Sequence, residues 1–482
     1  MSDRFQSDPT IFFIAFLLFT MTIIRVLTIP IFSIGYFEII FGLLFGIAAT
    51  PLFISLKRRQ IDLFEPIIFK SIFMFMTIIA LVNRIYLSEP FLRFEDIITF
   101  TFSGGFFLLC ILYSILFTSI IFGYYINILP FEKVSGIIPS AEEQNLSITR
   151  KIAGLYIVLG ILAYVATVAT AMDGNPLYVF ISSEARSQVF ASSPSAALRL
   201  VSRGLYMGYF LYLTTIFSRG YSPRVIHLLP FPGIVLLFAL FGGRGLTLQI
   251  VLMLVMMLYY VWVKEYVTVQ RNYFRFKKDQ INSIANQSIL PLMALAAGVF
   301  ALLARQLRKG LTMSEAIQNL DFVRLLTFGI HNSKFDYFLA LASVDKIGPY
   351  FGTLYLRVPL NFVPRSIWPE KPVLTVGSEL RRLLILNGTG GRPPGEIGVY
   401  FANFGYPGII ILGILCGLYL RVTYEALNRN TESPLAILLY SVLALPVIVV
   451  GLTNNSLWLI QVNFLFLLPV IVIHYAGWER IE

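Results

Sequence analysis

The chain has 482 residues, of which 57% are hydrophobic and 13% are charged, and its mean hydropathy is +0.78. Because an ordinary soluble domain carries about 25% charged residues, this composition excludes a soluble protein and is typical of a polytopic membrane protein. The formal net charge is +11, from 37 Lys and Arg against 26 Asp and Glu. No soluble domain gathers these cations on one folded face, so we expect no nucleic-acid partner.

About twelve apolar runs are long enough to cross the roughly 30 Å of hydrocarbon in a bilayer. Lipid offers no partner to unpaired backbone groups, and the alternating pattern of a β-barrel is absent, so each run is expected to be a helix. The predicted fold class is an all-α polytopic membrane protein with about 12 transmembrane helices. The runs lie near residues 11–29, 33–56, 66–87, 97–125, 152–172, 200–217, 225–241, 246–263, 287–303, 406–426, 435–452 and 457–475.

The spacing of these runs divides the chain into three parts. A nine-helix block over residues 1–303 is followed by a long region without a spanning run, residues 304–405, and by a three-helix block over residues 406–482. Short loops on one side of the predicted bundle carry about 17 Lys and Arg, and those on the other side carry about 6. Since cytoplasmic loops collect basic residues, the richer side and both termini are predicted to be cytoplasmic, with residues 304–405 outside.

Arginines in the other predicted outer loops are candidates for anion binding. Arg186, Arg199 and Arg203 surround the connection between the fifth and sixth runs, and the last two lie four residues apart on one helix face. Like charges at that spacing repel unless an anion lies between them. Arg244 stands among three glycines in a GGRG run, which permits close approach of a diphosphate. The alternatives are snorkelling to lipid headgroups and, for Arg244, a tight turn.

The long region 304–405 holds 12 basic and 7 acidic residues, an excess that topology does not explain. Its run VPRSIWPEKP is stiffened by prolines and combines Arg365, Trp368 and Lys371. Two cations beside an aromatic ring suit a sugar diphosphate, with the ring under the sugar. The same residues also suit an anchor at the lipid interface.

Three residues of this region are candidates for a general base. His331 has an unperturbed pKa near 6.5, suitable for accepting a hydroxyl proton near neutrality. Asp336 follows Ser333 in a pattern that predicts a helix over Phe335–Val344, and Glu396 lies in a GEIG run. A structural loop histidine and a helix-capping carboxylate remain the alternatives for the first two. The sequence has no phosphate-binding loop for ATP and no cluster of metal ligands, so neither a metal nor a cofactor is predicted.

The motifs together resemble those of the Wzy-type oligosaccharide repeat-unit polymerases, including the enterobacterial common antigen branch. The resemblance covers roughly residues 170–425. It is carried by Ser187–Phe190, Arg199 and Arg203, the GGRG run at 242–245, the basic edge Arg305–Gly310, the W-P-x-K-P run and PGEIGVYFANFG (Pro394–Gly405).

The resemblance implies a GT-C-like glycosyltransferase of the bacterial inner membrane. Such an enzyme moves a growing glycan from undecaprenyl diphosphate onto the next lipid-linked repeat unit, without a metal and with inversion. Its implied partners are the lipid-linked donor and acceptor, the bilayer and a chain-length regulator protein. The residues assigned to the diphosphates and the glycan are Arg186, Arg199, Arg203, Arg244, Arg305, Arg365, Trp368 and Lys371, and the base is one of His331, Asp336 and Glu396.

Two other functions remain open. An O-antigen ligase shares the donor and differs in its acceptor, which the sequence does not identify. A lipid-linked oligosaccharide flippase or other transporter is expected to place charge inside the bundle and to keep its loops short.

Overall fold

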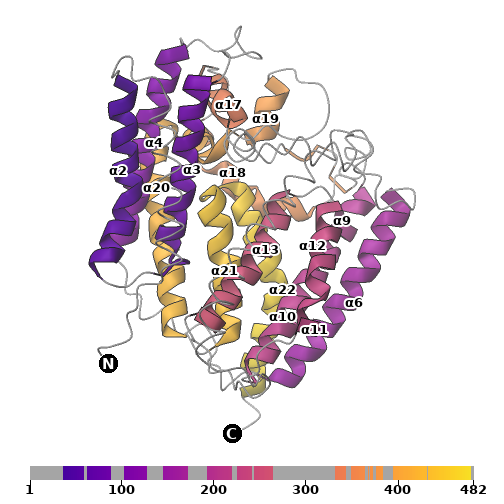
Figure 1. Cartoon of the computed structure of the whole chain (residues 1–482). Helices are drawn as coiled ribbons and strands as arrows, with labels where there is room; N and C mark the ends of the chain where they lie inside the picture. Colours follow the sequence, from indigo (N-terminus) through magenta and orange to yellow (C-terminus); the bar gives the residue numbers. More distant parts are fainter. Residues whose placement is uncertain are drawn as a thin grey trace, which may run out of the picture.

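The computed structural model is a bundle of helices (Figure 1). It describes residues 36–58, 62–87, 102–126, 145–171, 193–219, 225–240, 244–263, 332–343, 349–363, 367–368, 370–372, 376–383, 394–430 and 433–478. Every regular element in these ranges is helical, and none of them forms a strand. The predicted runs near 11–29 and 287–303 lie outside the described residues.

Five of the described helices are long and apolar enough to cross a membrane. They are α2 (Tyr36–Lys57), α4 (Phe102–Tyr125), α6 (Leu146–Ala171), α20 (Gly395–Arg429) and α22 (Asn454–Trp478). Shorter apolar stretches are Pro66–Val82 in α3 (Pro66–Leu87), Pro230–Ala239 in α12 (Pro230–Leu240), Gly245–Val261, which begins in α13 (Arg244–Leu258), and α21 (Pro434–Val450). The remaining elements are α9 (Ser193–Ser202), α10 (Gly204–Phe217), α11 (Val225–Leu228), a π-helix (Tyr259–Val263), α17 (Asn332–Ser343), α18 (Thr353–Leu356), a 3₁₀ helix (Val358–Phe362) and α19 (Val376–Leu383).

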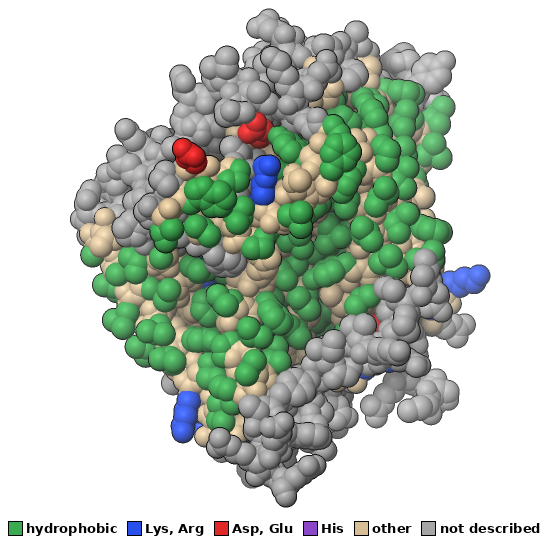
Figure 2. All heavy atoms as spheres, turned by 180° about the vertical axis from the view of Figure 1, so that it is seen from behind, with side chains coloured by type: hydrophobic (Ala, Val, Ile, Leu, Met, Phe, Trp, Pro, Cys, Tyr) green, Lys and Arg blue, Asp and Glu red, His purple; other side chains and the backbone are tan. Residues whose placement is uncertain are grey.

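The surface agrees with a membrane environment. Figure 2 shows hydrophobic side chains covering most of the described part of one face, with few charged groups among them. On α6, Leu155, Val158, Leu162 and Val165 are each more than half exposed. Such a continuous apolar exterior is unfavourable in water and favourable in lipid. The protein is therefore an all-α polytopic membrane protein, as the composition predicts.

Small residues bring α4 and α20 into close contact. A Cβ added to Gly413 would lie 2.8 Å from Cβ of Ser119, and one added to Gly417 would lie 2.6 Å from the backbone nitrogen of Tyr124. Lipid supplies no hydrophobic force between helices, so close backbone approach at such positions is a main source of their association. The contact fixes the second half of α20 beside α4.

Helix α20 is broken at Phe404 and Gly405. Gly405 has φ +67° and ψ −154°, a conformation that is open almost only to glycine. In one continuous helix, Tyr400 and Cys416 would stand about 24 Å apart. Instead the Tyr400 hydroxyl lies within hydrogen-bonding reach of the Cys416 thiol. The chain therefore folds back at Gly405, and the short first half of α20 lies along the second.

At one end of the bundle, buried carboxylates fix the start of α3. Asp62 Oδ2 accepts a hydrogen bond from the Tyr424 hydroxyl at 3.0 Å, and Glu65 Oε1 accepts one from the Tyr124 hydroxyl at 2.9 Å. The Tyr440 hydroxyl donates to the carbonyl oxygen of Phe64 at 2.6 Å. These bonds join α3 to α4, α20 and α21. We call this the Asp62 end.

The other end of the bundle holds α9, α17, α18 and α19, in the upper part of Figure 1. The helix predicted over Phe335–Val344 is observed here as α17. The loop before α18 donates from the backbone nitrogens of Tyr350 and Phe351 to the carbonyl oxygens of Ala402 and Asn403, at 2.9 and 2.7 Å. These bonds satisfy carbonyls of the last turn before the break in α20. We call this the α19 end.

Candidate functional site

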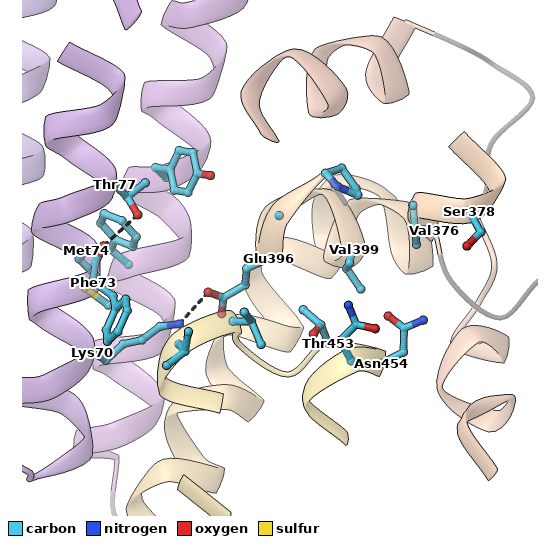
Figure 3. Close-up of a pocket in the computed structure, with 18 residues that line it drawn as sticks. Lys70, Phe73, Met74, Thr77, Val376, Ser378, Glu396, Val399, Thr453 and Asn454 are labelled. Atoms are coloured by element: carbon cyan, nitrogen blue, oxygen red, sulfur yellow. Dashed lines mark hydrogen bonds and ion pairs between the residues drawn. The ribbon is translucent and has the colours of Figure 1, made fainter. Parts of the chain in front are cut away.

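A cavity of about 480 Å³ lies between transmembrane helices and α19, and its wall reaches from α19 to Lys70, one turn after the start of α3 (Figure 3). Its volume is in the range of small-molecule binding sites. Helices α3, α4, α19, α20, α21 and α22 all contribute to its wall. The polar lining residues are Lys70, Thr77, Ser378, Glu396, Thr453, Asn454 and Asn455, and the aromatic ones are Phe73, Tyr113 and Phe117.

An ion pair between α3 and α20 forms part of this wall. Nζ of Lys70 lies 2.7 Å from Oε2 of Glu396, and the two side chains are 4% and 13% exposed. Figure 3 shows the two side chains pointing toward each other across the gap between their helices. Lys70 lies in a mostly apolar part of α3, where a charge is costly and is commonly retained for function.

The second oxygen of the Glu396 carboxylate is held by Tyr400. The Tyr400 hydroxyl donates to Oε1 at 2.9 Å, and it accepts from the backbone nitrogen of Leu452 at 2.8 Å. The Tyr355 hydroxyl donates to the carbonyl oxygen of the same Leu452 at 2.8 Å. The turn between α21 and α22 is thereby tied to α18 and α20, and the carboxylate has a fixed direction.

Gly451, in that turn, packs directly against the carboxylate. A Cβ at this position would overlap Cδ and Oε1 of Glu396, and the backbone has φ +71° and ψ −172°. Any other residue would therefore be strained in its backbone and would push the carboxylate away. Glycine is required here on both counts.

Three helices begin at the cavity. The first turns of α19, α20 and α22 contribute Val376–Ser378, Gly395–Glu396 and Asn454–Asn455 to the lining. The N-terminal end of each helix carries a partial positive charge and backbone N–H groups without helical partners. Together with Lys70, these ends make the cavity favourable for negative charge, which the Glu396 carboxylate supplies in part.

A second group of residues surrounds Arg203, between α9 and α10. Its Cζ lies 4.2 Å from the ring centroid of Trp458 on α22. Its Nη1 is buried and has no hydrogen-bond partner among the described residues. Arg199 lies one turn earlier, on α9. Burial, and in second place the charge of Arg203, lower the pKa of Arg199 to about 10. Two desolvated guanidinium groups this close together favour a bound anion.

The first two turns of α22 connect the cavity with Arg203. Asn454 and Asn455 line the cavity. The ring of Trp458, one turn later, makes the cation–π contact with Arg203. The Glu396 carboxylate and the two amide groups thus lie in the cavity wall, and the Arg203 guanidinium lies one turn further along α22, outside that wall. Such a set can bind a hydroxyl-rich molecule at one side and an anionic group at the other.

The structure brings only some of the sequence-predicted residues together. Glu396 lines the cavity, Arg203 lies on Trp458 of α22, and Arg199 lies one turn before Arg203. Trp368 is 40% exposed. Lys371 is 8% exposed and donates from Nζ to the carbonyl oxygen of Val363 at 2.9 Å. Neither Trp368 nor Lys371 lines the cavity.

The structure does not describe the side chains of the other predicted residues. Asp336 belongs to α17 and Arg244 begins α13, but their side chains lie outside the description. Four further residues lie outside the described residues altogether: Arg186, Arg305, His331 and Arg365.

Sequence reasoning missed Lys70, Tyr400, Gly451 and Trp458. For Lys70 a signal existed, because it is a charge inside a predicted span, where ionisable residues are costly. The other three have no distinctive local pattern, and only their contacts with Glu396 and Arg203 single them out. No family model, curated protein or solved structure matches the chain.

Proposed function

We propose that this protein is a glycosyltransferase of the bacterial inner membrane that polymerises undecaprenyl-diphosphate-linked oligosaccharide repeat units. One observation carries the proposal. Glu396, which belongs to a motif of the polymerase resemblance, lines a cavity whose amides, hydroxyls and aromatic rings suit a sugar. Among the three candidate bases, Glu396 is the one whose side-chain surroundings the structure describes. Those surroundings suit a general base that acts on a sugar hydroxyl.

The α19 end is then the extracytoplasmic end of a bundle of about 12 spans, and residues 304–405 form the outer region. The distribution of basic residues in the short loops supports this orientation. At the Asp62 end, the guanidinium groups of Arg58 and Arg421 lie over the rings of Tyr125 and Tyr124, at 5.4 and 5.5 Å. Aromatic rings with basic residues are typical of a membrane interface.

The reaction is a displacement at the anomeric carbon of the donor glycan. The acceptor hydroxyl forms the new C–O bond while Glu396 accepts its proton, and the bond to the lipid diphosphate breaks with inversion. The diphosphate leaves as an anion and needs cations rather than a proton donor. Arg203 and Arg199 stabilise this charge, assisted by the sequence-predicted Arg186, Arg244, Arg305 and Arg365.

A flippase or other transporter is the second candidate, and the structure gives a specific reason to keep it. The Lys70–Glu396 pair lies inside the bundle, and α20 is broken at Gly405. Charge between spans and interrupted helices are features of transporters. An O-antigen ligase also remains, because it differs from the polymerase only in its acceptor.

Reconstitution separates the three functions. The protein in liposomes, given one lipid-linked repeat unit, is expected to produce a ladder of lengthened glycans, and Glu396→Gln to lower the rate by about 100-fold or more. Glu425→Gln, on the same helix at the Asp62 end, is the control and is expected to retain activity. Transbilayer movement of the lipid without lengthening would replace the proposal by a flippase, and transfer only to an added second acceptor would replace it by a ligase.

A further inference from the structure

We infer that Lys70 is a positioning residue for Glu396: its ammonium group holds the carboxylate in place in the cavity wall. The inference rests on the proposed role of Glu396 as the base. Lys70 has no part in the polymerase resemblance, since it lies in α3, far outside residues 170–425. Its contact with Glu396 is what singles it out.

The contact is direct and shielded from water. Nζ of Lys70 lies 2.7 Å from Oε2 of Glu396 and 3.5 Å from the carbonyl oxygen of Val447. The Lys70 side chain is only 4% exposed. An exposed pair of this kind would be screened and weak, whereas here each charge depends on the other for its solvation. The pairing joins residues 326 positions apart, so it is a product of the fold.

Lys70 is the one cation facing Glu396 from the described elements around it. The other titratable groups near the carboxylate are Tyr113 on α4, Tyr355 on α18, and Tyr400 and Cys416 on α20. All four are neutral when protonated. Without Lys70 the carboxylate would lose its cationic partner from the described elements and would be held in place by the Tyr400 hydroxyl alone.

The competing explanation is that the ion pair only holds α3 and α20 together. The two explanations predict different results when the positive and negative charges exchange helices. A pair that only joins α3 to α20 still provides an attractive contact between the two helices when the charges are exchanged, and activity is then expected to survive in part. A pair that positions a base works only with the carboxylate on α20, beside Tyr400 and the first turn of α22. Exchanging the two residues therefore separates a structural role from a positioning role.

The experiment measures glycan lengthening by purified variants in liposomes, together with the amount of monodisperse protein in detergent. Lys70→Met is expected to lower kcat by about 100-fold with little change in KM, and Lys70→Arg to restore a measurable part of it. The exchange variant, Lys70→Glu with Glu396→Lys, is expected to yield folded protein that stays inactive. Lys70→Met with Glu396→Gln removes both charges and provides a folded, inactive reference if Lys70→Met alone folds poorly.

The outcomes separate the inference from the proposed function. Wild-type kcat in Lys70→Met, with Glu396→Gln inactive, would overturn the role of Lys70 and leave Glu396 as the base. An active exchange variant would show that the pair is structural. Wild-type activity of Glu396→Gln would instead remove Glu396 from the proposed mechanism, whatever the Lys70 variants do.

Discussion

The guanidinium group of Arg203 lies on the indole ring of Trp458, with its Cζ 4.2 Å from the ring centroid. The ring restricts the arginine to one direction without using its hydrogen-bond donors. Nη1 has no partner among the described residues and remains available to an anion. The first turns of α22 thus hold the arginine one turn away from the cavity that contains Glu396.

Replacing Trp458 by leucine is expected to weaken binding of the lipid-linked substrate. A desolvated cation–π contact contributes about 1–2 kcal/mol, so we expect KM to rise about 5- to 30-fold while kcat changes less. The KM of Trp458→Phe is expected to lie between the KM of the wild type and that of Trp458→Leu. The measurement is the dependence of the lengthening rate on substrate concentration. Phe464→Leu, further along α22, is the matched control, and an equal rise in its KM would contradict a specific role for the indole.

Gly405→Ala tests the break in α20. The substitution forces a side chain into a conformation that costs about 1–3 kcal/mol, while the added Cβ meets nothing nearer than 3.8 Å. We expect the free energy of unfolding to fall by that amount. The measurement is thermal unfolding of the purified protein in detergent. Gly233→Ala on α12, where a Cβ meets no atom within 4 Å, should not destabilise the protein. Unchanged stability of Gly405→Ala would show that the fold-back does not depend on this residue.

Gly451→Ala is expected to be more severe, because it combines the same kind of backbone strain with a clash against the Glu396 carboxylate. We expect a stability loss larger than that of Gly405→Ala. Activity should fall at least 10-fold in the protein that remains folded, since a base displaced from its position transfers protons poorly. The comparison of kcat per folded molecule between the two variants isolates the contact. Equal kcat values would argue against Glu396 as the base.

Because of the buried carboxyl group of Glu65, we expect the stability of the protein to depend on pH. Burial, as the largest cause, raises the pKa of Glu65 above 4.5, the nearby Asp62 adds to the rise, and the hydrogen bond from Tyr124 opposes it. Because the pKa in the folded protein is raised, the contribution of Glu65 to stability is fully present below pH 4.5 and is lost as pH rises through the folded-state pKa.

Glu65→Gln keeps an oxygen that can accept from Tyr124 and removes the charge. The variant is therefore expected to lose less stability than the wild type between acid and neutral pH. The measurement is Tm as a function of pH for both proteins. Parallel curves would show that Glu65 carries no buried charge cost. Glu425→Gln, whose side chain is partly exposed, serves as the control.

The sequence by itself determined the class of this protein and most of the helices in the part of the chain that the structure describes. Hydropathy is a local property, so apolar runs and their lengths identify membrane helices without knowledge of their neighbours. The boundary predicted between residues 405 and 406 lies where an apolar run begins, and it stays a prediction. The sequence also named Glu396 and the pair Arg199 and Arg203, through motifs and spacing.

The tertiary structure decided which of these residues share a site. Gly395–Asn403 is a helix folded against the bundle, a relationship that depends on the break at Gly405 and on the contact of α20 with α4. The partners of Glu396 come from α3, α18 and the turn before α22, and the partner of Arg203 comes from α22. Such pairings depend on how distant helices pack, which no local pattern contains.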